Sequence, residues 1–244
     1  MNILKSLCIW TAGVIFLIVS FPFTCLIWLV ALPFDRKRTV IHRVLLWHCA
    51  VYKCLVPLKS FNCEGKEKIA RGNTYIVISN HQSSLDIIFL NALGLNYKWI
   101  SKIENKKVPI IGWYLSMADY ISVDRNRADS KKRLFEKSYK SLKDGTSIMI
   151  FPEGTRSPNG EIGALKRGAF MLSIQTGVPL LPVVIDGTGG ILPKHGIVFG
   201  AKRDVKMRVL NPEYPEGFEI DNHREFALKI STLMKTVLND MRTK

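Results

Sequence analysis

The sequence predicts an α/β fold, a mixed sheet flanked by helices, with an N-terminal membrane-associated helical segment in front of it. Two observations lead to this fold class. After residue 59, short apolar runs alternate with helical patterns, as is typical of layered α/β domains. Before it, the chain from Leu7 to Leu32 contains no charged residue. We therefore expect two parts, membrane-associated helices over residues 1–58 and one globular domain over residues 59–244.

The uncharged segment is long enough, as one helix, to cross a hydrocarbon core of about 30 Å. Pro22 lies inside it, and an internal proline removes a backbone hydrogen bond and kinks or ends a helix. Basic residues flank both sides, Lys5 before the segment and residues 36–38 after it, so charge asymmetry gives a single span little orientation. We favour a segment broken near Phe21 that dips into one leaflet from the cytoplasmic face of the cell membrane. A true span is the alternative.

Residues 39–58 mix apolar side chains with His42, Arg43, His48 and Lys53. This pattern predicts an amphipathic helix that lies at a membrane interface. A helix that covers the core of the globular domain would give the same pattern.

The net charge of +15 favours an anionic partner, which could be nucleic acid, a membrane surface or an acidic substrate. The apolar N-terminal segment favours the membrane, and we expect no nucleic-acid partner. The five cysteines all precede residue 64 and form no Cys-x-x-Cys pair. We therefore expect neither a metal site nor a disulfide framework, which fits a reducing cytoplasmic face.

The remaining elements follow from apolar periodicity. Strands are predicted at residues 75–79, 120–123, 147–151, 178–185 and 205–210, and helices at residues 85–95, 129–143, 168–176 and 222–241. Pro179 and Pro182 indicate that the fourth strand lies at a sheet edge or has an irregular entry. The last helix is expected to bury Phe226, Ile230, Leu233, Val237 and Met241.

Two polar segments directly follow predicted buried strands. The first, residues 80–86, reads Asn-His-Gln-Ser-Ser-Leu-Asp. A histidine can act as a base when a carboxylate bound to its other nitrogen fixes the tautomer, and Asp86 could hold His81 in this way. Such a pair occurs often by chance, so a structural or surface His81 stays the alternative on this segment alone.

The second segment, residues 151–157, reads Phe-Pro-Glu-Gly-Thr-Arg-Ser. Pro152 and Gly154 prevent regular structure, so backbone amides could converge there. Arg156 supplies a planar cation suited to a phosphate. Glu153 could accept from a substrate hydroxyl or hold Arg156, and an ordinary loop with a surface ion pair is the alternative.

These segments resemble two motifs of the glycerolipid acyltransferase family, which includes the lysophosphatidate acyltransferases. Residues 80–86 are similar to the first motif and residues 151–157 to the third. Residues 178–183 look like the fourth motif. The second is matched by Lys102, Glu104, Pro109, Gly112 and Arg125. The match keeps order and spacing over residues 75–187.

The resemblance implies transfer of an acyl chain from a thioester, acyl-CoA or an acyl carrier protein, to the free hydroxyl of lysophosphatidic acid in the bilayer. No bound cofactor is expected. His81 would be the general base and Asp86 its orienting partner. The acceptor phosphate would bind Lys102, Arg125 and Arg156, in a pocket shaped by Glu153, Gly154 and Thr155.

Two other classes remain open at this stage. A His-Asp pair beside Ser83 and Ser84 could serve a lipid-ester hydrolase, although the chain lacks Gly-x-Ser-x-Gly. A lipid- or nucleic-acid-binding protein would explain the charge and the apolar segment but not the pairing of His81 with Asp86.

Overall fold

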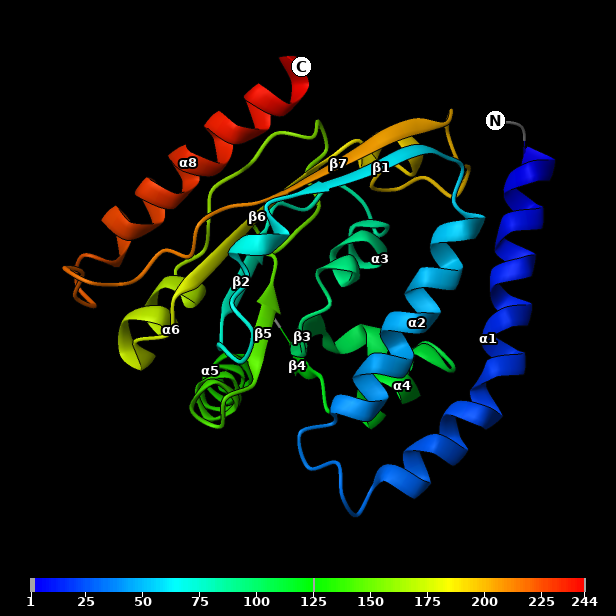
Figure 1. Cartoon of the computed structure of the whole chain (residues 1–244), viewed down its shortest axis with the longest axis horizontal. Coiled ribbons are helices and arrows are strands. Elements are labelled where there is room, and N and C mark those ends of the chain that lie inside the picture. Colours follow the sequence, from blue (N-terminus) through cyan, green and yellow to red (C-terminus); the bar gives the residue numbers. More distant parts are fainter. Residues whose placement is uncertain (1–2, 125, 244) are drawn as a thin grey trace.

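A computed structural model of the chain describes residues 3–124 and 126–243 (Figure 1). Within these residues the strands form one seven-stranded sheet of order β1-β7-β6-β2-β5-β3-β4. Neighbouring strands are parallel except β6 and β7, so the predicted mixed sheet is confirmed. The strands are β1 Leu58–Glu64, β2 Ile76–Ser79, β3 Tyr97–Lys102, β4 Ile121–Val123, β5 Ser147–Ile150, β6 Leu180–Asp186 and β7 Arg203–Val209.

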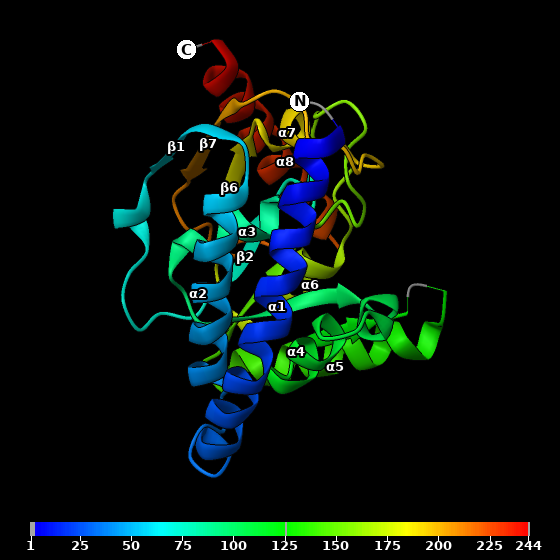
Figure 2. The ribbon, with the colours of Figure 1, turned by 90° about the vertical axis from the view of Figure 1, so that its right-hand side faces the viewer.

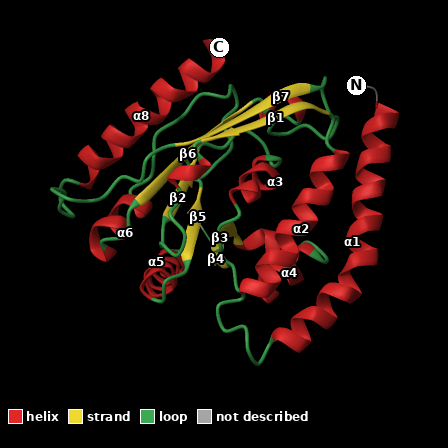
Figure 3. Ribbon diagram, viewed as in Figure 1, coloured by secondary structure: helices red, strands yellow, loops and turns green. Residues whose placement is uncertain are grey.

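Helices cover both faces of the sheet, as Figure 3 shows. Helices α5, α6 and α8 pack on one face, whereas α2, α3 and α4 pack on the other. The α-helices are α1 Ile3–Ala31, α2 Thr39–Leu55, α3 Asp86–Leu90, α4 Ile111–Met117, α5 Ala128–Lys143, α6 Gly168–Thr176, α7 Thr188–Ile191 and α8 His223–Thr243. Short 3₁₀ helices lie at Lys66–Lys68, Asn91–Leu93 and Ile103–Lys107.

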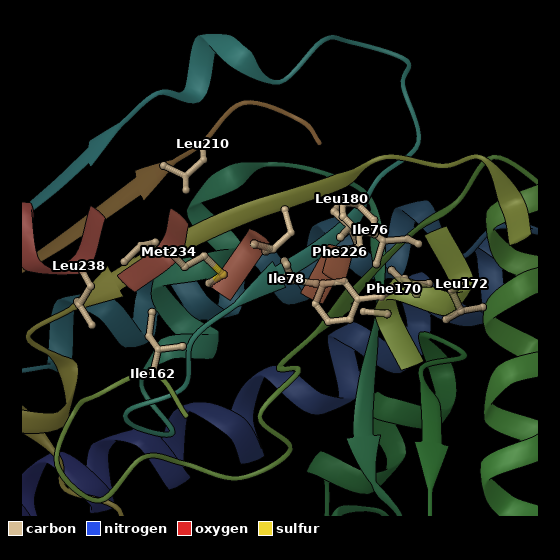
Figure 4. Close-up of a cluster of buried hydrophobic side chains, with 14 of the residues drawn as sticks. Ile76, Ile78, Ile162, Phe170, Leu172, Leu180, Leu210, Phe226, Met234 and Leu238 are labelled. Atoms are coloured by element: carbon tan, nitrogen blue, oxygen red, sulfur yellow. The ribbon is translucent and has the colours of Figure 1, made fainter. Parts of the chain in front are cut away.

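The central strand β2 supplies both cores. Because side chains alternate along a strand, Ile76 and Ile78 pack with residues of α6 and α8 (Figure 4), whereas Val77 belongs to the core on the other face. On α8 the fully buried residues are Phe226, Ile230, Met234, Leu238 and Met241. The predicted Leu233 and Val237 are only partly buried, since they flank this face and do not form its centre.

Of the two arrangements predicted for the proline-containing strand, an edge position or an irregular entry, the edge position is wrong. β6 lies between β2 and β7 in the interior of the sheet. Val183 pairs with Val209, the last residue of β7, and the carbonyl of Pro182 accepts from Leu210 N beyond it. Pro182 therefore sits where β7 has ended, and the missing N–H leaves that regular ladder intact.

Four elements were not predicted, β1, β3, α4 and α7, and the helix expected over residues 85–95 is short. α3 ends at Leu90 and a 3₁₀ turn follows, after which Gly94 adopts a φ of 71°. This left-handed residue turns the chain into β3. The periodic apolar pattern was right for the first turns only.

The expected break at Pro22 is also wrong. α1 runs as one helix of 29 residues with Pro22 inside, and Figure 1 shows it bending in its course without ending. α2 packs beside the turns before the proline, where Tyr52 donates to Gly13 O at 2.6 Å and His48 lies 2.9 Å from the Ser20 hydroxyl, and beyond the proline Trp28 packs against the core cluster that contains Ile41 of α2. These contacts preserve the helix despite the lost hydrogen bond.

The segment predicted as an amphipathic helix is α2, which lies between α1 and the sheet. Its Ile41 and His42 are buried, and His42 contacts Tyr120 OH at 2.7 Å. Trp47 is exposed on the other side. The helix thus covers the core on one face, and a role at an interface stays a prediction for the exposed face. The division after residue 58 also stays a prediction.

Candidate active site

The predicted site residues follow strands that run in the same direction. β2, β5, β3 and β4 are parallel neighbours, so their carboxyl ends meet at one edge of the sheet. His81 follows β2, the segment 151–157 follows β5, and Lys102 ends β3. This edge is where ligands bind in open α/β sheets. Arg125 comes after β4 but lies outside the described residues.

Asp86 holds His81 directly. The Nδ1 atom of His81 lies 2.7 Å from Asp86 Oδ2, which also accepts from Gln82 N at 2.7 Å and Ser83 N at 2.9 Å. The Thr188 hydroxyl donates to Oδ1, the other carboxylate oxygen. Asp86 is 0% exposed. A carboxylate with this many donors is fixed in position.

The imidazole ring of His81 is fixed in a second way, by stacking on Phe151. The ring centroids lie 3.8 Å apart with an interplanar angle of 8°. Because Nδ1 donates to Asp86, Nε2 carries the lone pair, and within the described residues it has no hydrogen-bond partner. The His81 side chain is 16% exposed. The His81 ring is thus held in one orientation, with Nε2 unpaired among the described residues.

Glu153 joins the two predicted segments. Its Oε1 accepts from His81 N and its Oε2 from Gly163 N, both at 3.0 Å, and Ser157 N donates to His81 O at 2.7 Å. Burial raises the pKa of Glu153 above its ordinary value. The proposed pairing of Glu153 with Arg156 is not present, because both carboxylate oxygens are committed to backbone amides. Glu153 instead fixes the loop beside the base.

Two basic side chains of the site have no partner among the described residues. Arg156 is partly exposed and Lys102 is exposed, and neither side chain has a hydrogen bond or an ion pair among the described residues. Thr155, next to Arg156, is exposed as well. Such cations can accept an anionic group without first breaking another contact.

A further cation, Lys166, lies in the space that Gly154 leaves free because it has no side chain. The φ of Gly154 is +72°, and a Cβ built there would lie 2.5 Å from Lys166 Nζ. Lys166 N also donates to Pro152 O at 2.8 Å. The sequence prediction missed Lys166, because its Nζ comes close to Gly154 only after the chain has folded back on itself.

Other contributors were missed for the same reason. Thr188 follows β6, the strand beside β2, so the rule of strand ends could have pointed to it. A polar network lies behind the loop: Gln82 Nε2 donates to Gly160 O and Asp186, and Arg242 of α8 contacts both of these groups and Glu161. No sequence signal connects Arg242 with this site.

Within residues 3–124 and 126–243, no three His, Cys, Asp or Glu side chains gather as a metal-binding group.

Comparisons with known proteins agree with this architecture. The structure superposes on the 1-acyl-sn-glycerophosphate (LPA) acyltransferase PlsC from Thermotoga maritima with a TM-score of 0.86, covering 100% of this chain and 97% of that chain at 24% identity. This likeness confirms the fold.

Relatives by sequence include the chloroplastic 1-acyl-sn-glycerol-3-phosphate acyltransferases LPAT1 of Arabidopsis thaliana and BAT2 of Brassica napus. The chain is 37% identical to the first over 85% of its length and 35% identical to the second over 82%. The matches span 60% and 56% of those proteins, less than two thirds of their length. The model of the family described as Acyltransferase matches residues 60–186, which include both polar segments. The chain belongs to the acyltransferase family.

Proposed function

We propose that the protein is a 1-acyl-glycerol-3-phosphate O-acyltransferase of phospholipid biosynthesis. It moves a fatty acyl chain from acyl-CoA or an acyl carrier protein to the free hydroxyl of lysophosphatidic acid, giving phosphatidic acid. The observation that carries the proposal is the oriented His81 beside a loop whose Arg156 has no hydrogen bond or ion pair among the described residues. The names of the curated relatives support the choice of acceptor.

In this mechanism the acceptor hydroxyl approaches Nε2 of His81 and gives up its proton as its oxygen attacks the thioester carbonyl. Asp86 stabilises the imidazolium that forms. Collapse of the tetrahedral intermediate breaks the carbon–sulfur bond, and the imidazolium returns the proton to the leaving thiolate. The ester and a free thiol are the products.

The acceptor phosphate would bind on the basic side, to Arg156 and Lys102, with Arg125 assigned by sequence only. Thr155 offers an exposed hydroxyl on the same loop, and Gly154, whose N–H donates to Phe151 O, shapes the turn that presents it. Glu153 keeps this loop at a fixed distance from His81 through its two amide contacts. One end of the acceptor is therefore held while its hydroxyl meets the base.

A hydrolase mechanism through Ser83 fits less well. The Ser83 hydroxyl is buried, donates to Leu192 O at 2.7 Å and accepts from Leu85 N. It is therefore committed within the fold and not oriented toward His81. We expect sequential kinetics without an acyl-enzyme intermediate.

Membrane association of the N-terminal segment is part of this proposal. α1 is long and apolar enough to cross a membrane, yet it contacts the globular domain along its length, from Trp10 at Ile197 to Phe21 at Trp113. Its outer face exposes a row of large apolar side chains. A helix that contacts the domain at these two points fits partial burial in one leaflet, at the cytoplasmic face.

Thioester consumption tests the reaction. With lysophosphatidate present, the free thiol should appear together with phosphatidic acid, and without it thiol release should be minimal. Release to water at a similar rate would favour a hydrolase, and no release with either donor would favour a binding protein. A ping-pong pattern, or acyl chain trapped on Ser83 or Ser84, would contradict direct transfer.

Accessibility labelling tests the topology. Single cysteines at residues 2 and 39, in a background without exposed native thiols, should both react from the cytoplasmic side of sealed vesicles. Labelling from opposite sides would establish a span and would leave the catalytic assignment intact.

A further inference from the structure

The loop that follows α7 carries an apolar tip that the site does not use. Ile197 is 75% exposed, and Val198 beside it is also exposed. Lone exposed apolar residues are common on protein surfaces, so exposure alone has no meaning. The surroundings of Ile197 distinguish it.

The tip of this loop lies against the N-terminal turns of α1. Trp10 Nε1 donates to Ile197 O at 2.7 Å, and Phe199 N donates to the Ser6 hydroxyl at 3.0 Å. The rings of Trp10 and Phe199 lie 5.3 Å apart. Figures 1 and 2 both place the chain after α7 beside the N-terminal end of α1. Ile197 therefore adjoins α1 in space although the two are far apart in sequence.

The part of α1 that meets the loop belongs to its exposed apolar face. Trp10 shares a helix face with Leu7, Val14 and Ile18 because they lie three, four and eight positions away. All four side chains are exposed. Ile197 and Val198 thus extend a continuous apolar surface of α1 onto the globular domain.

The loop presents this tip in a fixed conformation. Gly196 N donates to Pro193 O at 3.0 Å within the tip, and Gly200 N donates to Ile191 O at 2.7 Å across the base of the loop. Backbone hydrogen bonds therefore hold the loop both at its tip and at its base. Phe199 is buried in the core with Ile191 and Leu192. The outward position of Ile197 is therefore part of the fold, since its neighbours on both sides are anchored.

We propose that the loop of residues 193–198 is a second lipid-contacting element, which inserts Ile197 and Val198 into the same leaflet as α1. The occupant of this surface is the acyl-chain region of a bilayer, because the surface continues the uncharged face of a helix with membrane-spanning length. Lys194 and His195 precede the tip and would lie at the level of the lipid headgroups.

This insertion would couple the bilayer to the catalytic segment. Leu192 O, at the base of the loop, accepts from the Ser83 hydroxyl, and Thr188 of α7 holds Asp86. The loop and the base thus share one rigid unit, so the depth of Ile197 sets the height of His81 above the leaflet.

This proposal rests on the membrane association proposed above. Site-specific photo-crosslinking tests it and does not require enzyme turnover. A benzophenone amino acid is placed at Ile197, at Ile18 on the exposed face of α1, or at Leu228 on α8. Leu228 is a matched control, because it is 68% exposed and lies on α8, which packs on the face of the sheet opposite α2. The full-length variants are illuminated in vesicles of phosphatidylethanolamine and phosphatidylglycerol, and peptide adducts are identified by mass spectrometry.

We expect lipid acyl-chain adducts at positions 197 and 18 and none above background at 228. Adducts at 18 with position 197 no better than 228 would overturn the second contact and preserve the association of α1. Absence of lipid adducts at both positions 18 and 197 would overturn this inference and the proposed membrane association together. Crosslinks from 197 to another copy of the chain, with no lipid adduct, would assign the tip to a protein interface and overturn this inference.

Discussion

The two halves of the candidate site differ in how fully their polar groups are satisfied. Around Asp86 every contact is made within the protein, by the His81 ring, two backbone amides and the Thr188 hydroxyl. Around Arg156 and Lys102 the described residues supply no partner. Under the proposed function, the fold would hold the base in place before any substrate arrives, and a ligand would supply the partners of the cations. Groups that must be preorganised are buried and bonded, whereas groups that bind are left open.

If this contrast is correct, removal of the base should have the largest effect. His81→Ala should lower turnover by about 10²- to 10⁴-fold, the usual contribution of general base catalysis, while membrane association is unchanged. Asp86→Asn should also lose activity, since an amide cannot stabilise the imidazolium. Turnover and vesicle sedimentation measure the two properties. More than half of the wild-type rate in His81→Ala would contradict the assignment.

Removal of an open cation should affect binding more than turnover. Arg156→Ala should raise the KM for lysophosphatidate by about 10- to 100-fold, the cost of losing a hydrogen bond to a charged group, with little change in the KM of the donor. Arg156→Lys should recover only part, because an ammonium lacks the bidentate fork. Arg224→Ala, an exposed arginine on α8, serves as the control. Equal effects on both substrates would place Arg156 outside the acceptor site.

Thr188 belongs to the half of the site around Asp86, where the polar groups are bonded within the protein. Thr188→Val removes one donor from the buried Asp86 carboxylate and should lower kcat by about 3- to 10-fold, with KM values nearly constant. Thr188→Ser keeps the hydroxyl and should restore the rate. If the serine and valine variants were equally impaired, the hydroxyl contact would have no role in positioning the base.

The smallest effect is expected where the two halves are joined. Arg242→Ala releases Gly160 and Glu161 from α8 and should raise the acceptor KM by about 2- to 5-fold, in line with exposed ion pairs. Arg208→Ala is the matched control, since it also breaks an ion pair to α8, at Asp240, but does not touch the loop. Identical KM values in the two variants would reduce Arg242 to a general stabilising contact.

The successes of sequence prediction were local. The positions of β2, β5, α5 and α6 follow from short apolar patterns and from glycines such as Gly177, which caps α6 with a φ of 72°. His81 and Asp86 are five positions apart, so a strand end and one turn suffice to pair them. The failures at Pro22 and at β6 have one origin. The cost of a proline is read from its local sequence, whereas the packing of α1 against α2 and the position at which β7 ends depend on distant parts of the chain.

The sequence by itself determined the α/β class, the apolar N-terminal helix and the two polar segments, because each depends on the order of neighbouring residues. Only the tertiary structure decided which distant groups complete them. Thr188 reaches Asp86 across 102 positions, and Trp10 reaches Ile197 across 187. Such contacts leave no periodic signal in the chain, since one arises when the sheet order brings β6 beside β2 and the other when α1 packs beside the loop after α7.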